Sequence, residues 1–271
     1  MSDSKPPEEQ LNLLDLRGRT ALVTGAGQGI GAQTARYLAA HGARVVVNDF
    51  VAARADAIAA EINAAGGTAL AAQGDVTNFD VLSEIVSSAS ASLGVIDVLV
   101  NNAGNAGADP SAITGKPFWK TTPAEWEPFI GVNLYGVLNA SRAVIPAMIE
   151  AGKGGRLITI ISDAGRVGEA GLEAYSAAKA GAAGLMRALA HSLGRYDITA
   201  NCIAIGATRT PAIERALANE EMVKKILRKY PLHRVGEPSD IAAMVTFLAS
   251  PSASWITGQT YPVNGGFSVS Q

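Results

Sequence analysis

The stretch TALVTGAGQGIGAQTARYLAAHGARVVVND, residues 20–49, decides the fold. It begins with a short apolar run, 20–25, which is rich in strand-forming residues and ends in a glycine-rich turn. Apolar residues at helical spacing follow and stop at Gly42, and a second apolar run occupies 43–49. A strand, a helix and another strand in this order predict a βαβ unit, whose two strands lie parallel in one sheet.

The same alternation continues to the end of the chain. Further strands are expected near 68–75, 96–104, 156–162, 198–206 and 257–265, and further helices near 52–65, 78–94, 123–151, 172–194, 211–229 and 238–249. Continuous apolar strands between helices are typical of a mostly parallel sheet that is covered on both faces. No linker, repeat or shift in composition divides the chain. We therefore predict an α/β protein with a single-domain, doubly wound Rossmann fold and a mostly parallel seven-stranded sheet.

Composition excludes several classes of function. Of the 271 residues, 48% are hydrophobic and 17% are charged, so the chain can bury a sizeable core. The formal charge of −2 leaves no surplus of cations for a nucleic-acid backbone, and nucleic acid is not an expected partner. No stretch approaches the ~18 consecutive apolar residues of a membrane helix, so a membrane partner is not expected either.

The N-terminus and the few cysteines and histidines give further expectations. The first ten residues lack the pattern of a secretory signal, so a cytoplasmic location is expected. We expect a mobile polar extension over 1–15 and one domain over 16–271. The single cysteine, Cys202, excludes an internal disulfide, and its apolar neighbours favour a buried thiol over a reactive one. No metal is expected, because metal-ligand spacing is absent around His41, His191 and His233.

The turn TGAGQGIG, residues 24–31, predicts a dinucleotide site. The G-x-G-x-x-G spacing is not met, because Ile30 stands where the third glycine should be. The pattern present is T-G-x-x-x-G-x-G, formed by Thr24, Gly25, Gly29 and Gly31. Glycines allow a pyrophosphate to approach the backbone, and the helix that follows offers free N–H groups and the positive end of its dipole. A purely structural turn is the alternative.

Asp49 predicts which dinucleotide binds. It closes the second strand, 24 residues after Gly25, close to where a carboxylate can accept hydrogen bonds from the adenosine ribose. A carboxylate there would repel the 2′-phosphate of NADP, and the nearest arginine, Arg54, lies further along the chain. NAD is therefore the expected cofactor. The alternative is that Asp49 only caps the helix that follows.

Several motifs in order resemble the short-chain dehydrogenase/reductase family. They are the glycine pattern, NNAG at 101–104 and Tyr175-x-x-x-Lys179, together with GDV at 74–76, VNLYG at 132–136 and ITGQTYPVNGG at 256–266. The resemblance covers the chain from about residue 16 to its end. It implies an NAD-dependent oxidoreductase that acts on a CH–OH group of a small molecule.

The catalytic residues that the resemblance implies are Asn133, Ser162, Tyr175 and Lys179. Residues four apart on a helix share a face, so Lys179 should lie close enough to Tyr175 to lower the pKa of its phenol. The phenol would then serve as a general acid or base. In the family the lysine also holds the nicotinamide ribose, the serine polarises the substrate carbonyl, and the asparagine holds a water that links the lysine to solvent. A core tyrosine beside a lysine that reaches toward solvent is the alternative.

The resemblance also implies the remaining cofactor contacts. Residues 75–76 should flank the adenine, and residues 102–104 should line the path of the dinucleotide. Ile205, Gly206 and Thr210 should lie near the nicotinamide amide. The complete set of predicted cofactor-binding residues is Thr24, Gly25, Gln28, Gly29, Ile30, Gly31, Asp49, Phe50, Asp75, Val76, Asn102, Ala103, Gly104, Tyr175, Lys179, Ile205, Gly206, Thr208 and Thr210.

Three positions depart from the family pattern. Ile205 stands where a proline usually precedes Gly206, so a fixed φ is lost beside the nicotinamide. Asp163 replaces the common serine after Ser162 and places a carboxylate by the active site, unless Arg166 pairs with it. Asn264 stands where an aspartate is usual.

The substrate is less well defined by sequence. The long segment 105–127 holds Phe118 and Trp119, which either wall the substrate site or serve packing or a subunit contact, whereas Trp126 is expected in the core. Residues 207–231 should form a lid over the substrate. The cluster KKILRK, 224–229, either meets the phosphates of a coenzyme A thioester or is a solvated helix face.

Residues 162–181 are most similar to bacterial 3-oxoacyl-thioester reductases and hydroxyacyl-CoA dehydrogenases, including ones that act on cyclic acyl-CoAs. The alternatives are a hydroxysteroid or cyclic terpenoid alcohol dehydrogenase and, in another class, a non-catalytic NAD-binding sensor or scaffold. The small residues of 177–184 imply, by resemblance, a helix that packs against its copy in a homotetramer, a dimer of dimers.

Overall fold

A seven-stranded sheet forms the centre of the computed structural model, which describes residues 12–104, 116–214 and 220–269. The strand order is β3-β2-β1-β4-β5-β6-β7, and every pair of neighbouring strands is parallel. This confirms the predicted α/β class and the doubly wound Rossmann fold. The strands are β1 (Thr20–Val23), β2 (Arg44–Asp49), β3 (Thr68–Gln73), β4 (Val98–Asn101), β5 (Gly155–Ser162), β6 (Ile198–Ile205) and β7 (Thr260–Val263).

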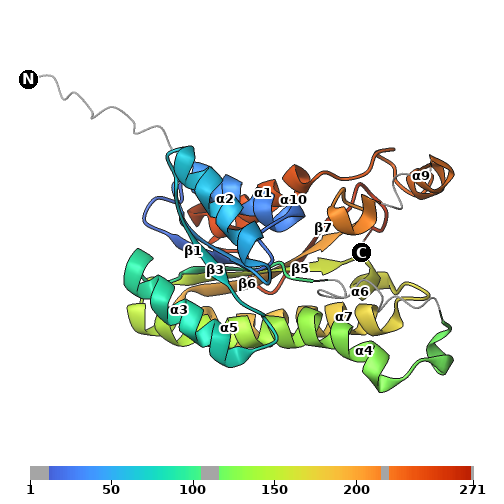
Figure 1. The fold of residues 1–271 in the computed structure, drawn as a ribbon, viewed down its shortest axis with the longest axis horizontal. Coiled ribbons are helices and arrows are strands. Elements are labelled where there is room, and N and C mark those ends of the chain that lie inside the picture. The colour runs from blue at the N-terminus through green and yellow to red at the C-terminus, as the bar shows by residue number, and fades with distance from the viewer. Residues whose placement is uncertain (1–11, 105–115, 215–219, 270–271) are drawn as a thin grey trace, which may run out of the picture.

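Helices cover both faces of the sheet (Figure 1). One face packs against α1 (Gly29–Ala40), α2 (Ala52–Ala64) and α10 (Pro238–Ala249). The other face packs against α3 (Phe79–Leu93), α5 (Gly136–Ala151) and α7 (Glu173–Leu193). The shorter helices are α4 (Pro123–Ile130), α6 (Ala164–Val167) and α9 (Glu220–Leu227), and 3₁₀ turns are formed by Phe118–Lys120, Gly194–Tyr196, Pro211–Ile213 and Pro251–Ala253.

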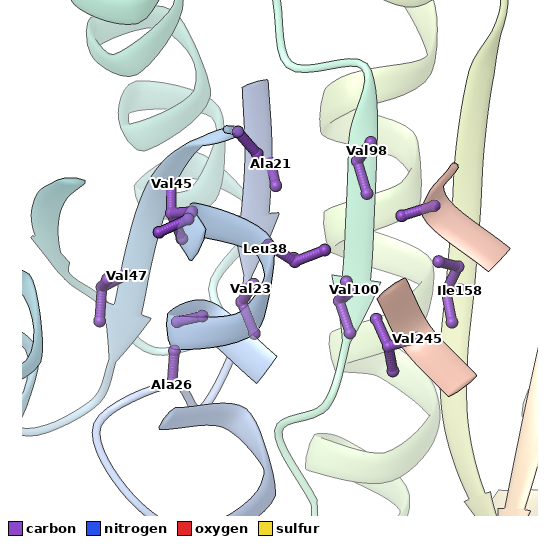
Figure 2. Packing of buried hydrophobic residues seen from close by; sticks show 14 of the residues in the cluster. Ala21, Val23, Ala26, Leu38, Val45, Val47, Val98, Val100, Ile158 and Val245 are labelled. Carbon is purple, nitrogen blue, oxygen red and sulfur yellow. The ribbon is translucent and has the colours of Figure 1, made fainter. Parts of the chain in front are cut away.

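The apolar strands are continuous because both of their faces are buried. On β2, Val45 and Val47 belong to one hydrophobic cluster and Val46 belongs to the other. Figure 2 shows Val45 and Val47 in the same cluster as Leu38 of α1 and Val245 of α10. Successive side chains of a strand point to opposite faces, so a strand between two helical layers needs apolar residues at every position.

The helix predicted near 123–151 is interrupted. α4 ends at Ile130, Gly131–Tyr135 forms a π-helical turn, and α5 begins at Gly136. Inside this wide turn, Asn133 Nδ2 donates a hydrogen bond to the carbonyl oxygen of Phe129 at 2.8 Å. Such turns often occur at functional sites. The interruption is a local competition between side chain and backbone, which hydrophobic periodicity does not register.

Two other predicted elements are shorter than expected. The last strand covers Thr260–Val263 rather than 257–265. Over 211–229, the structure shows the turn Pro211–Ile213 and α9, while residues 215–219 lie outside the described residues. Residues 1–11 also lie outside the described residues. The first described residues contact the domain, because the carbonyl oxygen of Leu13 accepts a hydrogen bond from Ser252 Oγ at 2.7 Å.

Within the three described ranges, no helix is long and apolar enough to cross a membrane. Cys202 is buried on β6, as predicted, and burial raises the pKa of its thiol to about 12. Thiolate is the reactive form of cysteine, so this thiol is inert at neutral pH.

Replacement of a fully buried side chain should destabilise the fold. Leu99 on β4 is 0% exposed, and Leu99→Ala should lower the free energy of unfolding by about 2–5 kcal/mol because a cavity remains. Urea denaturation followed by circular dichroism measures this change. Leu13→Ala is the matched control, because the Leu13 side chain is largely exposed and its loss should change stability little. Equal losses in the two variants would contradict the assigned core.

Candidate active site

The glycine-rich turn between β1 and α1 is hydrogen-bonded to the end of β4. Thr24 Oγ1 accepts hydrogen bonds from the backbone N–H groups of Asn102 (3.0 Å) and Ala103 (3.1 Å). Asn102 Nδ2 in turn donates to the carbonyl oxygens of Thr24 (2.9 Å) and Gly25 (3.0 Å). Thr24 and Asn102 therefore fix two loops against each other at the carboxyl edge of the sheet, where ligands bind in open α/β folds.

Close packing requires glycine at two positions of this turn. A Cβ atom on Gly31 would lie 2.2 Å from the carbonyl oxygen of Gly25 and 2.4 Å from Asn102 Nδ2. Gly25 itself has a φ of +61°, and a Cβ there would lie 2.9 Å from Ala103 Cα. The turn thus presents bare backbone in front of the N-terminus of α1, which is an arrangement that fits a pyrophosphate.

Asp49 lies beside this turn at the end of β2 and is buried. Its Oδ2 accepts a hydrogen bond from the N–H of Gly27 and its Oδ1 accepts one from the N–H of Val51, both at 2.9 Å. Val51 is the residue just before α2, so this hydrogen bond helps to fix the start of that helix. It is similar to the helix-capping role that is the alternative for Asp49. The sequence does not predict the contact with Gly27. The only signal for it in the sequence is the glycine at position 27, two residues after Gly25. A carboxylate has about four acceptor positions, so Asp49 retains capacity for ribose hydroxyls.

The predicted catalytic residues lie together at the ends of β5 and α7. Ser162 is the last residue of β5, and it hydrogen-bonds to the phenol of Tyr175. Lys179, one helical turn after Tyr175, is buried and donates from Nζ to the carbonyl oxygen of Ile160 at 2.9 Å. Its Nζ lies 5.8 Å from the centre of the Tyr175 ring.

Gly104 brings the fourth predicted residue to this group. A Cβ atom on Gly104 would lie 3.0 Å from both Asn133 Oδ1 and Lys179 Nζ. The π-helical turn thus directs Asn133 to the buried end of Lys179. On the same side, the Phe129 ring packs edge-on against the Tyr175 ring, with 6.3 Å between their centres. The end of α4, the π-helical turn and α7 therefore meet around the predicted catalytic tyrosine.

The predicted effect of Lys179 on Tyr175 is wrong. Burial raises the pKa of the Tyr175 phenol to about 12, against the opposing effect of its hydrogen bond with Ser162. Burial also lowers the pKa of the Lys179 ammonium to about 8. Loss of water penalises the charged form of both groups, and this penalty exceeds the attraction expected from their spacing on the helix. Tyr175 is therefore a neutral phenol at neutral pH, and Ser162 is the neighbour that stabilises its anion.

The loop after β6 completes the edge of the site. Thr210 lies against the glycine-rich turn, because a Cβ on Gly29 would be 3.3 Å from Thr210 Cγ2. Thr208 is buried, and its Oγ1 donates to the carbonyl oxygen of Gly206 at 3.2 Å. Ile205 is the last residue of β6. The residues predicted near the nicotinamide are thus adjacent to the turn predicted to hold the pyrophosphate.

The predicted adenosine end is more open. Val76 is buried, and Asp75 is half-buried, with Oδ1 accepting from the N–H of Thr77 at 2.9 Å. The side chain of Ile30 is buried in the hydrophobic core beside the glycine-rich turn. Gln28 and Phe50 are exposed on the rim.

Aromatic residues before and within α4 stack on one another. The rings of Phe118 and Trp126 are stacked with 5.4 Å between their centres, and Trp126 Nε1 donates to Thr121 Oγ1 at 2.7 Å. Trp126 is only half-buried, so its expected place in the core is wrong. The side chain of Trp119 is 81% exposed. The part of the predicted substrate segment that covers 105–115 lies outside the described residues.

The chain is similar to several known proteins. A family model described as enoyl-(acyl carrier protein) reductase matches residues 25–268. The chain is 41% identical over 254 residues to a 3-oxoacyl-[acyl-carrier-protein] reductase of Synechocystis sp., covering 93% of this chain and 97% of that protein. It is 39% identical over 258 residues to the (2S)-[(R)-hydroxy(phenyl)methyl]succinyl-CoA dehydrogenase subunit BbsD of Thauera aromatica, covering 94% and 99%.

A solved structure is also similar. It is a 7α-hydroxysteroid dehydrogenase complexed with NADH and 7-oxo glycochenodeoxycholic acid. The TM-score is 0.87 at 38% sequence identity, with 94% of this chain and 96% of that chain covered.

Gly31→Ala should abolish tight binding of the dinucleotide. The new Cβ would meet the carbonyl of Gly25, so the turn must move, and we expect the Kd for NADH to rise at least about tenfold. NADH fluorescence titration measures this Kd. Gly194→Ala is the matched control, because nothing lies within 4 Å of its added Cβ. Unchanged affinity in a folded Gly31→Ala protein would show that the turn is not the pyrophosphate site.

Proposed function

The chain belongs to the short-chain dehydrogenase/reductase family, and we propose that it is an NAD-dependent oxidoreductase that interconverts a secondary alcohol and a ketone. The observation that carries this proposal is the meeting of Asn133, Ser162, Tyr175 and Lys179 beside the glycine-rich turn. A sensor or scaffold that only binds NAD would not need an acid, its hydrogen-bond partner and a buried cation at one point.

The residues act in distinct ways in the proposed reaction. When bound, the nicotinamide coenzyme supplies or accepts the hydride. In the direction of reduction, Tyr175 donates its proton to the carbonyl oxygen of the substrate as the hydride reaches the carbonyl carbon. A pKa of about 12 keeps this phenol protonated and ready to donate at neutral pH. The Ser162 hydroxyl orients the same carbonyl oxygen.

Lys179 and Asn133 support the proton transfer. The Lys179 pKa of about 8 leaves the ammonium mostly charged at neutral pH, and the Ile160 carbonyl holds it in place. This ammonium lies 5.8 Å from the centre of the Tyr175 ring, on the proposed path by which a proton returns to the phenol. Asn133 can both donate and accept, and its Oδ1 faces the region of the ammonium. This supports the proposed relay of a proton from solvent to Lys179.

Burial of Asp49 supports the proposed preference for NAD. Its carboxylate accepts from Gly27, so it lies against the turn, and a 2′-phosphate nearby would meet a buried like charge. Arg54 offers the opposing interaction, since its Cβ would be 2.5 Å from a Cβ on Gly27, but its side chain is exposed. We therefore propose that the Asp49 carboxylate, rather than Arg54, determines the preference for NAD over NADP.

Asp49→Asn tests this preference. The amide keeps the shape and one acceptor oxygen but removes the charge, so the ratio of kcat/KM with NAD to that with NADP should fall about tenfold or more. Steady-state rates read from the absorbance of the reduced nicotinamide give both values. Asp56→Asn, on the exposed side of α2, is the control and should leave the ratio unchanged. An unchanged ratio in Asp49→Asn would assign the preference to another group.

An acyl thioester or a cyclic acyl-CoA is the proposed substrate. The similarity to a 3-oxoacyl-[acyl-carrier-protein] reductase and to the (2S)-[(R)-hydroxy(phenyl)methyl]succinyl-CoA dehydrogenase subunit BbsD supports this class. The aromatic pair Phe118 and Trp126 supports it too, because α4 also carries Phe129, which packs on Tyr175. An apolar wall beside the reacting carbon suits an acyl chain or a ring. The cluster 224–229 adds little, since Lys224 pairs with Glu221 at 3.0 Å.

A hydroxysteroid is the second candidate. The similar solved structure is complexed with a 7-oxo steroid acid, and its fold covers 94% of this chain. A panel of acyl-CoAs, steroids and cyclic alcohols, assayed with NAD and with NADP, separates the two classes.

We also propose a homotetramer in which α7 packs against its copy. Ala177, Ala180 and Ala188 are exposed and Gly184 is partly so, and these small residues recur at helical spacing. Such a stripe lets two helix backbones come close.

A cytoplasmic location stays a prediction.

Tyr175→Phe tests the proposed chemistry. The ring and its contact with Phe129 are kept, but the transferred proton is lost, so kcat should fall about 100- to 10,000-fold while NADH still binds. The rate of ketone reduction and an NADH fluorescence titration measure the two effects. Tyr37→Phe on α1 is the matched control. Full activity in Tyr175→Phe would refute the assignment, and a wild type that binds NADH but reduces no ketone would favour the sensor.

A further inference from the structure

Asp163 follows Ser162 in the sequence, and both oxygen atoms of its carboxylate accept hydrogen bonds. It is 2% exposed. Its Oδ1 accepts from Arg166 Nη1 at 2.8 Å and from Ser268 Oγ at 2.9 Å, and its Oδ2 accepts from Asn264 Nδ2 at 2.7 Å. Arg166 thus forms an ion pair with Asp163, which is one of the two possibilities that the sequence allows. Two positions that depart from the family pattern, Asp163 and Asn264, also contact each other, although 101 residues separate them.

Residues 264–268, which we call the brace, form a tight loop around this carboxylate. Asn264 Nδ2 also donates to the carbonyl oxygen of Ser268 at 2.9 Å, and Asn264 Oδ1 accepts from the N–H of Gly266 at 3.0 Å. Arg166 Nη1 donates to Ser268 Oγ at 2.9 Å as well. Charge-assisted hydrogen bonds of this kind are shorter and stronger than neutral ones. The brace is therefore fastened to the end of β5 by hydrogen bonds to both members of the Asp163–Arg166 ion pair.

The brace reaches the opposite side of the site through Tyr230. The rings of Phe267 and Tyr230 are stacked with 5.2 Å between their centres. The Tyr230 hydroxyl accepts a hydrogen bond from the N–H of Ala207 at 2.7 Å. A Cβ on Gly206 would lie 2.9 Å from that hydroxyl oxygen, so the loop after β6 packs directly on Tyr230. This loop includes Ile205 and Gly206, which the sequence predicts near the nicotinamide amide.

β5 and β6 are also joined at this point. The N–H of Asp163 donates to the carbonyl oxygen of Ile205 at 3.0 Å. The backbone of Asp163 thus contacts one end of the loop after β6, and its side chain reaches Ala207 through Phe267 and Tyr230. A single residue connects to both ends of 205–207.

We propose that Asp163 is a positioning residue, which sets Ser162 and the loop 205–207 at a fixed separation through the brace. The inference rests on the proposed function, because that function places Ser162 on one side of the reacting centre and the loop 205–207 on the other. Asp163 touches neither substrate nor cofactor in this scheme. It replaces a fixed proline as the source of rigidity beside Ile205.

Asp163→Asn removes the charge at nearly constant shape. The amide turns its N–H₂ toward a donor, either Asn264 or Arg166, so at least one hydrogen bond is lost. We expect kcat to fall about tenfold or more and the KM for NAD to change less than about twofold. Amide hydrogen exchange, measured by mass spectrometry, should become at least about tenfold faster in peptides covering 203–210 and 264–269. Peptides covering β1 and β2 should be unchanged.

Three further variants sharpen the test. Ser268→Ala removes only one hydroxyl and should give a smaller effect of the same kind in a stable protein. Asn264→Asp sets two carboxylates against each other and should be as harmful as Asp163→Asn. The exchange Asp163→Asn/Asn264→Asp keeps one carboxylate and one amide in contact and should recover at least about fivefold of the lost kcat. Glu61→Gln, which disturbs the remote ion pair with Arg36 at 2.7 Å, is the control.

The outcomes separate this inference from the proposed function. If wild type reduces no ketone or thioester, the proposed function fails, and hydrogen exchange at 203–210 still decides whether the brace positions that loop. If wild type is active, three results overturn the inference: full kcat in Asp163→Asn, faster exchange confined to 264–269, or additive losses in the double variant.

Discussion

All strands of the sheet run in one direction, and this constraint places the active site. The last residues of β1, β2, β4, β5 and β6 reach the same edge, so Val23, Asp49, Asn101, Ser162 and Ile205 end their strands side by side although 182 positions, from 23 to 205, separate the first from the last. Each loop that follows carries a predicted binding or catalytic group. The parallel pairing is in turn enforced by helices that cross over both faces, whose apolar sides fill the two clusters of the core.

Close backbone contact is the second requirement at this edge. The glycine-rich turn can lie against the end of β4 only because Gly25 and Gly31 lack side chains. Thr24 and Asn102 then join the two loops through hydrogen bonds that a different pair of side chains would not form. Thus the glycines proposed to leave room for a pyrophosphate also allow the two loops to pack together, so the proposed binding site and the fold depend on the same contacts.

The sequence predicted the fold well, and the structure brings the proposed catalytic residues together, because both depend on patterns local to the chain. Strand and helix order follows from apolar periodicity, and Tyr175 and Lys179 are adjacent on any helix. What sequence could not supply depends on distant contacts and on burial. The link from Asp163 to Asn264 spans 101 positions, and the role of Tyr230 has no local signal. The π-helical turn at Asn133 and the rise in the pKa of Tyr175 likewise arise only in the packed protein.

Burial explains how three ionisable groups coexist at the end of β5. Each group is taken out of water, which costs free energy for its charged form unless partners compensate. The Asp163 carboxylate accepts hydrogen bonds from Arg166, Asn264 and Ser268. The Lys179 ammonium donates to the neutral carbonyl of Ile160, and burial lowers its pKa to about 8. Tyr175 avoids the cost by staying neutral. The carboxylate with several donors is thus suited to a structural role, whereas the proposed function assigns the moving protons to Tyr175 and Lys179, the two groups whose charged forms burial disfavours.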